Sequence, residues 1–476
     1  MLFNSLHFVV FFIVVTTLYF VLPHRYRWFM LLVASCYFYM VFVPIYILIL
    51  GGTIIVDYFA GIWLEKMEGK GRRVFLIASL VANIGVLAVF KYYNFLNHNL
   101  SVLLNSFGYR NSIPNLSILL PIGLSFHTFQ AMSYTIEVYR RKQKAEKNFG
   151  IYALYVMFYP QLVAGPIERP QNMLHQFYEK HSFDFKRVVD GLKLMLWGFF
   201  IKLVIADRLA IYVNAVYNNP DKHSGFTLAL ATVFFAFQIY CDFSGYSNIA
   251  IGAARVMGFK LMTNFNRPYF SRTISEFWKR WHISLSTWFT DYLYIPLGGN
   301  RVSVPRWYFN LFFVFLVSGL WHGANWTFII WGAINGFYLV FALVTAKWRN
   351  KLTAFVGLDR QPSLHRFLQI FTTFILACFA WIFFRANSAD DGFLIVRRIF
   401  EFQGPLYIGD LPQLAYCVIS ILFLLLVEMK QEYVIHTPLP FQSRYWLKEQ
   451  LAYVMLIIII LLIGVFDSSQ FIYFQF

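Results

Sequence analysis

The sequence predicts an all-α, polytopic membrane protein, and its composition and its pattern of apolar runs both point to this fold class. Of 476 residues, 59% are hydrophobic and only 13% are charged, whereas soluble domains average roughly 45–50% apolar and about 25% charged residues. Apolar runs of about 17–25 residues, the length that crosses a bilayer, recur along the chain. This composition excludes a soluble enzyme, a disordered chain and a protein that binds nucleic acid through a solvated basic face.

The first half of the chain is predicted to alternate between membrane crossings and basic loops. The first run, residues 6–22, has no Lys or Arg before it and no small-residue cleavage site after it, so we expect a retained helix. The next apolar run is interrupted at Pro44, and the one after it ends at Leu64. Further runs cover residues 74–92 and 118–138. The positive-inside rule puts the basic loops on one side and the amino terminus outside; these loops are residues 24–27, 65–73 and 140–147.

The second half is less regular. A basic and aromatic region between Arg255 and Arg306 interleaves polar with apolar residues, which is typical of an interfacial or re-entrant segment. An amphipathic surface element beside anionic lipid is the simpler alternative. Around this region, helices are predicted over residues 188–212, 227–250, 308–320, 326–345, 367–384, 413–427 and 451–466.

His322 is the sharpest candidate for chemistry, because the chain lacks the serine-elbow, phosphate-loop, zincin and dinucleotide motifs of soluble enzymes. A helix over residues 308–320 would measure about 20 Å, less than the roughly 30 Å hydrocarbon core. His322 would then lie inside the membrane, at a glycine-containing break between two helices. A neutral imidazole in a cavity there is suited to act as a general base. A hydrogen-bonded core histidine is the alternative.

Two further clusters carry polar groups in apolar surroundings. His282 lies among tryptophans in residues 278–284, where it is either structural or functional. Residues 238–247 place a carboxylate and several hydroxyls at the end of an apolar helix, with Gln238 and Asp242 on one face and Tyr240 and Ser244 on another. They would line a polar path, or form a hydrogen-bond network between helices. Four scattered cysteines without CxxC spacing predict no metal site and no disulfide.

Seven segments carry recognisable motifs: residues 90–95, 121–130, 158–169, 242–247, 277–286, 321–326 and 471–476. They resemble the membrane-bound O-acyltransferase (MBOAT) family, and in particular its bacterial branch that includes the alginate O-acetylation membrane protein. The resemblance implies that His322 is the catalytic histidine and His282 a second functional histidine. It also implies a single domain over residues 1–476, with about eleven or more helices, re-entrant or horizontal segments, and a central tunnel.

The function implied by this resemblance is transfer of an acyl group, expected to be acetyl, across a bacterial inner membrane. The donor would be a cytoplasmic thioester, acetyl-CoA or an acyl carrier, with no permanently bound cofactor. The acceptor would be an alginate-like polysaccharide or an extracytoplasmic acetyltransferase-like partner protein, and membrane lipids would surround the chain. Alternatives are peptidoglycan or teichoic-acid acylation, and a transporter or flippase. The residues expected to line the tunnel are Asp242, Gln238, Tyr240, Ser244, Trp321 and Asn325.

Overall fold

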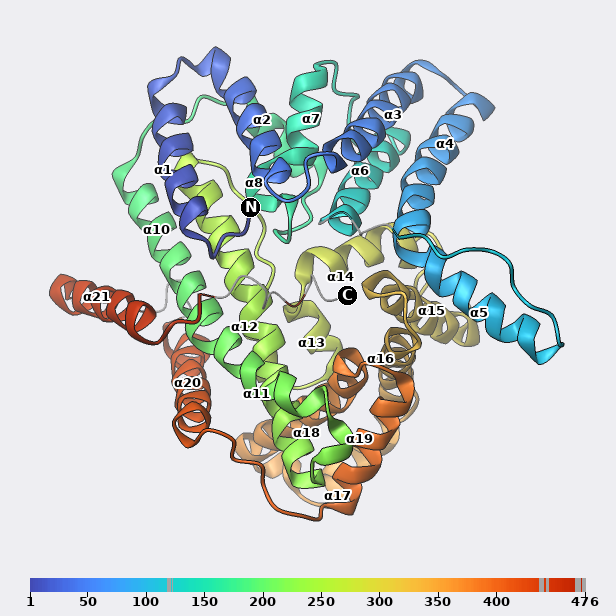
Figure 1. The fold of residues 1–476 in the computed structure, drawn as a ribbon, viewed down its shortest axis with the longest axis vertical. Helices are drawn as coiled ribbons and strands as arrows, with labels where there is room; N and C mark the ends of the chain where they lie inside the picture. Colours follow the sequence, from blue (N-terminus) through green and yellow to red (C-terminus); the bar gives the residue numbers. More distant parts are fainter. Residues whose placement is uncertain (118–120, 122, 436–440, 442–444, 467–471, 473–476) are drawn as a thin grey trace. The chain divides into compact units, whose positions relative to one another are not determined.

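The computed structural model describes residues 1–117, 121, 123–435, 441, 445–466 and 472, and within these residues the regular secondary structure consists of helices, without strands (Figure 1). The all-α prediction is therefore confirmed. The chain divides into two compact units. The first consists of Met1–Met195 and Ser247–Met262, and the second of Leu196–Tyr246 and Thr263–Phe476. Helices α10 (Phe185–Phe200) and α12 (Gly225–Met257) contribute residues to both.

The first unit is built around α6 (Leu124–Tyr139), whose side chains are nearly all buried. Helices α3 (Tyr46–Lys66) and α4 (Lys70–Leu87) pack against it. The buried Asp57 carboxylate of α3 accepts hydrogen bonds from Ser79 (2.6 Å) and Asn83 (2.9 Å) of α4, and Ser79 also contacts Thr135 of α6. The remaining segments of this unit are α1 (Leu6–Val21), α2 (His24–Met40), η1 (Ala88–Tyr92), α5 (Tyr93–Ser106), α7 (Phe149–Met157), α8 (Tyr159–Leu162), α9 (Pro170–Met173) and η2 (Leu174–Phe177).

The second unit has a core rich in aromatic side chains, to which α12 and α18 (Pro362–Arg385) contribute most, while α16 (Trp326–Val344) contributes Phe328 and Trp331. Helix α16 pairs with α15 (Val304–His322) over most of its length (Figure 1). The other segments are η3 (Ile201–Ala206), α11 (Asp207–Tyr217), η4 (Pro220–Lys222), η5 (Pro268–Phe270), α13 (Ile274–Arg280), α14 (Ile283–Phe289), η6 (Thr290–Tyr294), α17 (Ala346–Phe355), η7 (Leu358–Arg360), α19 (Ala389–Glu401), α20 (Leu411–Lys430), η8 (Gln431–Ile435) and α21 (Trp446–Ile463).

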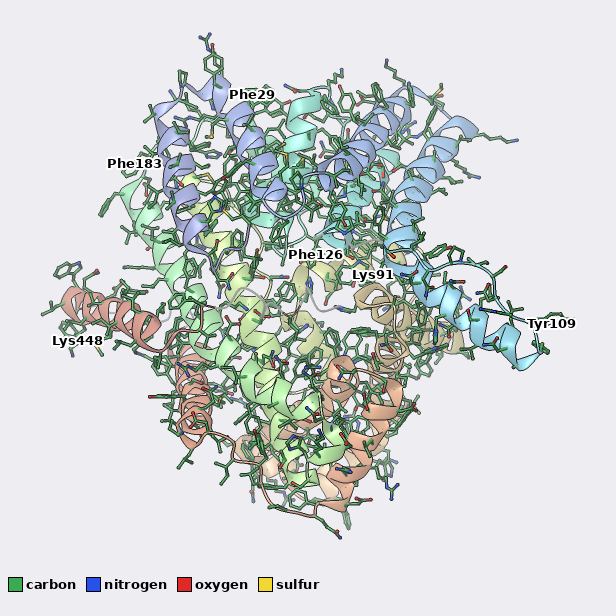
Figure 2. All side chains as sticks on the ribbon, in the orientation of Figure 1. Phe29, Lys91, Tyr109, Phe126, Phe183 and Lys448 are labelled. Carbon is green, nitrogen blue, oxygen red and sulfur yellow. The ribbon has the colours of Figure 1, made fainter. Side chains whose placement is uncertain are left out.

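Seven helices in the described residues are long and apolar enough to cross a membrane, so the chain is a multi-pass membrane protein. Many apolar side chains remain exposed, among them Phe29 of α2 and Phe183 in the loop before α10, which project from the first unit (Figure 2). Hydrocarbon is the environment in which such side chains are stable. The candidate spans are Tyr46–Lys66, Lys70–Ser106, Gly225–Met257, Trp326–Val344, Pro362–Arg385, Leu411–Val434 and Trp446–Ile463.

Most predicted helices are present, and the break at Pro44 is confirmed, since α2 ends at Met40 and α3 begins at Tyr46. The helix predicted over residues 118–138 begins at Leu124; residues 118–120 and 122 lie outside the described part of the chain. The predicted length of the helix before His322 was wrong. Helix α15 has 19 residues, about 28 Å, because it begins at Val304, before Arg306, and includes His322. The depth of His322 in the membrane therefore does not follow from helix length.

The backbones of α15 and α16 come into direct contact where both helices carry glycine. A Cβ atom added at Gly319 would lie 2.2 Å from the carbonyl oxygen of Phe328, and one at Gly332 would lie 2.5 Å from that of Phe315. Gly332 and Gly336 form a GxxxG pattern, which allows close helix contact inside a membrane. This contact sets the spacing of the two helices on either side of His322.

We predict that Gly332→Ala destabilises the protein, because the added methyl group meets backbone that has no room to move. Overpacking of this kind costs about 1–3 kcal/mol. Thermal melting of the purified protein in detergent should show a clear fall in the midpoint. Gly85→Ala in α4 is the matched control, since nothing lies within 4 Å of a Cβ atom there. Equal melting temperatures for the Gly332→Ala protein and the wild type would contradict the assigned contact.

Candidate active site

His322 is the last residue of α15 and lies at a break that the local sequence builds. Gly323 ends the helix in an extended conformation, and a Cβ atom there would lie 2.1 Å from the Phe328 ring. Asn325 begins α16 as its N-cap: its side-chain oxygen accepts a hydrogen bond from the Thr327 amide (3.1 Å). Its side-chain nitrogen donates to the Asn387 carbonyl (3.3 Å). The predicted break is thus confirmed, with Asn325 as its cap.

The His322 ring is buried among aromatic side chains, with a residue exposure of 8%. Its centroid lies 5.0 Å from Trp321, 5.0 Å from Trp331 and 5.2 Å from Phe384, each in an edge-on arrangement. Trp331 also stacks on Trp381 of α18, 6.0 Å away. Rings from α15, α16 and α18 therefore hold the imidazole in a defined orientation.

A cavity of about 620 Å³ comes within one helical turn of His322. Ser318 lines it from α15, four residues before His322 and on the same helix face. Trp278 of α13 also lines it, and the Trp278 ring contacts Trp331 (5.6 Å), which in turn contacts His322. The walls are mainly apolar, with a few hydroxyl, amide and cationic groups contributed by Ser275, Lys279, Thr287, Tyr294, Asn300 and Ser318. A void of this size can hold a small organic substrate.

His282 is the N-cap residue of α14 and adopts a left-handed backbone conformation with φ of 43°. This conformation is uncommon for a residue other than glycine and is often retained at functional sites. Asn264 stabilises the turn: it accepts hydrogen bonds from the Ile283 amide (2.9 Å) on its carbonyl and from the Ser284 hydroxyl (2.9 Å) on its side chain. The imidazole packs edge-on against Phe243, with centroids 4.5 Å apart. Burial lowers the pKa of His282 to about 3, so the ring is neutral at physiological pH.

Asp242 belongs to a buried ion cluster centred on Lys202. The Lys202 ammonium lies 2.6 Å from an Asp207 oxygen and 2.5 Å from an Asp242 oxygen, and all three side chains are 1% exposed. The second Asp242 oxygen accepts a hydrogen bond from the Ile472 amide (2.7 Å). Lys202 is not among the residues predicted from the sequence, although a lysine in the apolar stretch of residues 194–206 is the kind of signal that marks a buried charged site.

The other predicted residues of α12 are also buried. The Tyr240 hydroxyl donates a hydrogen bond to the Glu428 carboxylate of α20, another partner that the sequence analysis missed. Gln238 and Ser244 are 2% and 3% exposed. These contacts fit the predicted network between helices, and the alternative role, lining a polar path, stays a prediction.

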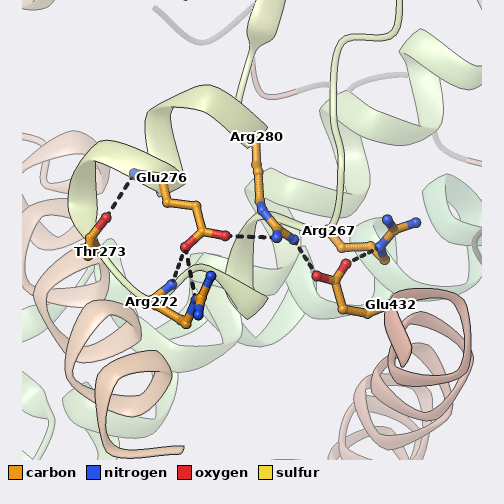
Figure 3. A network of polar contacts seen from close by, with 6 residues as sticks. All are labelled: Arg267, Arg272, Thr273, Glu276, Arg280 and Glu432. Carbon is orange, nitrogen blue, oxygen red and sulfur yellow. Dashed lines mark hydrogen bonds and ion pairs between the residues drawn. The ribbon is translucent and has the colours of Figure 1, made fainter. Parts of the chain in front are cut away.

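Three arginines of the basic region are paired with carboxylates, as Figure 3 shows. Glu432 accepts from Arg267 (2.7 Å) and Arg280 (2.9 Å), while Glu276 contacts Arg280 (2.8 Å) and Arg272 (3.7 Å). Because Glu432 follows α20 and the arginines flank or belong to α13, the network joins these two segments. The region predicted to be interfacial or re-entrant is thus a set of short helices held by ion pairs.

The fold and the site define a polytopic membrane protein with two buried histidines and a substrate-sized cavity. Residues 124–384 match the MBOAT family, membrane-bound O-acyltransferases, and this span includes both His282 and His322. The chain belongs to this family and is an O-acyltransferase. Membership of the family favours acyl transfer over the transporter alternative.

The chain is similar to several characterised or named relatives over most of its length. It is 39% identical to the probable alginate O-acetylase AlgI of Pseudomonas aeruginosa over 390 residues, which cover 81% of this chain and 72% of the relative. It is 33% identical to the peptidoglycan O-acetyltransferase of Helicobacter pylori over 79% of this chain and 74% of that protein. A teichoic acid D-alanyltransferase of Bacillus subtilis is 27% identical over 55% and 68% of the two chains.

We predict that Lys202→Met strongly destabilises the protein, because it leaves two buried carboxylates without their shared cation. Removing one partner of a buried ion pair costs about 3–5 kcal/mol. The expected result is a large fall in the thermal midpoint and in the yield of folded protein from membranes.

The triple variant Lys202→Met, Asp207→Asn, Asp242→Asn is the matched control. It removes the uncompensated charge, and should therefore regain part of the lost stability. If the Lys202→Met protein had the same melting temperature as the wild type, the ion cluster would not be needed to stabilise the second unit.

Proposed function

We propose that this chain transfers an acetyl group from a cytoplasmic thioester, across a bacterial inner membrane, toward an extracytoplasmic polysaccharide. The observation that carries the proposal is the buried His322 imidazole at the α15–α16 break, one helical turn from a cavity of about 620 Å³. Family membership supplies the reaction class, and the burial of His322 at this break supports its proposed role in the reaction.

In the proposed reaction, His322 acts as the general base. It removes the proton from an acceptor hydroxyl, and the hydroxyl oxygen attacks the thioester carbonyl carbon. The carbon–sulfur bond then breaks, an ester forms, and the thiolate leaves and takes up a proton. The rings of Trp321, Trp331 and Phe384 orient the imidazole, so that it is held close to the reacting hydroxyl. The same rings exclude water, which limits hydrolysis of the thioester.

His282 is proposed to act as a second functional residue. Its ring is neutral and its backbone is held in a left-handed turn by Asn264, so its orientation is set before substrate arrives. A neutral imidazole can donate one hydrogen bond and accept another. This would suit a group that positions the acceptor or the leaving thiol.

The acceptor is proposed to be a polysaccharide of the alginate type, or a protein that passes the acetyl group to it. Relatives that match over most of this chain are named as a probable alginate O-acetylase and a peptidoglycan O-acetyltransferase. Because the sequence contains no serine-elbow motif for a final transfer step, we propose that an extracytoplasmic acetyltransferase-like partner completes the reaction. The teichoic-acid route, with an acyl carrier as donor, is the more distant alternative.

We predict that His322→Gln lowers acetyl transfer by at least about 100-fold, because general-base catalysis contributes roughly 10²–10⁴ in rate. The measurement is release of free thiol from acetyl-CoA by purified protein, together with ester-linked acetate on the polysaccharide of complemented cells. His98→Ala, an exposed position on α5, is the control and should leave both unchanged. Undiminished acetylation by a normally expressed His322→Gln protein would remove the general-base role.

A further inference from the structure

A second cavity, of about 530 Å³, lies in the first unit and is lined by cationic side chains. It is formed by the beginning of α10 and by the end of α12 with the residues that follow. Lys186 and Arg187 come from the first segment and Arg255 and Lys260 from the second, accompanied by Asp184 and Asp190. Four cations against two carboxylates give the lining a formal charge of +2.

The cationic groups of this cavity are not neutralised by the protein. Within the described residues, none of the four forms an ion pair with a carboxylate. The Arg187 Nε atom is buried without a hydrogen-bond partner, while its Nη2 group donates to the Ser182 carbonyl (2.5 Å). The arginines of the Glu276–Glu432 network differ, because each of those lies against a carboxylate (Figure 3).

The cavity is held by rigid backbone. In the first unit, α10 and α12 touch at Gly191 and Gly252, where an added Cβ atom would lie 2.8 Å and 2.6 Å from the opposing carbonyl oxygens. Gln176 fixes the backbone of Lys260 through two hydrogen bonds, 2.8 Å to its amide and 3.0 Å to its carbonyl. The Lys260 backbone is thus fixed while its side chain stays exposed at the cavity.

Contacts within the first unit connect this cavity to the basic loops that the positive-inside rule assigns to the cytoplasm. Arg27 donates to the carbonyl of His181 (2.6 Å), and the His181 ring packs on Phe259 of the cavity wall (4.9 Å). The Tyr178 hydroxyl donates to Glu146 (2.7 Å) in the loop of residues 140–147. By the same rule, the cavity opens on the cytoplasmic side.

We infer that this cavity binds the phosphate groups of the thioester donor, an assignment that rests on the proposed function. Guanidinium and ammonium groups are strong, charge-assisted donors to phosphate oxygens. Coenzyme A carries a 3′-phosphate and a diphosphate at the end remote from its thiol, and a carrier protein presents one phosphodiester at the same place. An anionic ligand would offset the formal charge of +2 that the lining carries. A phospholipid headgroup offers the same chemistry and is the competing source.

The test compares CoA with pantetheine, which has the same thiol arm and no phosphate, on the full chain in phosphatidylcholine nanodiscs. Arg255→Gln and Lys260→Gln should each weaken CoA binding at least about tenfold, the value of one charge-assisted hydrogen bond, and leave pantetheine binding unchanged. Arg255→Lys should retain part of the CoA affinity. Lys142→Gln removes an exposed cation from the loop of residues 140–147, outside the cavity, and should leave CoA binding unaltered.

Unchanged CoA affinity in both Gln variants would overturn the inference, as would equal weakening of CoA and pantetheine. The lipid source is tested by adding phosphatidylglycerol to the nanodiscs. If phosphatidylglycerol competes with CoA for the wild type but not for the Gln variants, both ligands bind the cavity through phosphate. The donor assignment is then retained, and the lipid is a competitor for the same site. If the Gln variants lose phosphatidylglycerol binding and keep CoA affinity, the donor assignment is wrong. Failure of the proposed function would show separately, as a wild type that binds CoA but releases no acetyl group from acetyl-CoA.

Discussion

Direct backbone contact between α15 and α16 is the constraint on which the candidate active site depends. Gly319 and Gly332 leave no space for a methyl group between the helices, so the pair is rigid up to the break at Gly323. The break places His322 at the end of one helix, and Asn325 begins the next. Without that contact, the rings of Trp331 and Phe384 would not converge on the imidazole.

Several buried polar groups elsewhere in the chain find partners among other buried side chains, which offsets the cost of placing them in apolar surroundings. Asp57 binds Ser79 and Asn83 in the first unit. In the second, Lys202 gathers two aspartates, and Tyr240 binds Glu428. These groups give each unit a defined internal structure. The α10–α12 cavity differs because its lining carries more cations than carboxylates.

The fold class, most helices and the break at His322 could be predicted from the sequence, because long apolar runs and a Gly-Ala-Asn interruption are local signals. The length of α15 could not, because Arg306 resembles a helix boundary in the sequence although the helix begins before it, at Val304. The partners of Asp242 and Tyr240 were also missed. Glu428 is 188 positions away from Tyr240, and only the tertiary fold brings such residues together. Lys186 and Lys260 likewise line one cavity only because the tertiary fold brings their segments together.

The proposed mechanism requires the acceptor hydroxyl and the thioester carbonyl to meet at the His322 imidazole. A cryo-EM structure of the chain with a non-hydrolysable acetyl-CoA analogue would show whether they do. We expect the analogue's carbonyl beside His322, with a ring nitrogen within about 3 Å of the position that an attacking hydroxyl must occupy. An analogue whose carbonyl lies elsewhere, with His322 enclosed by protein on every side, would contradict it.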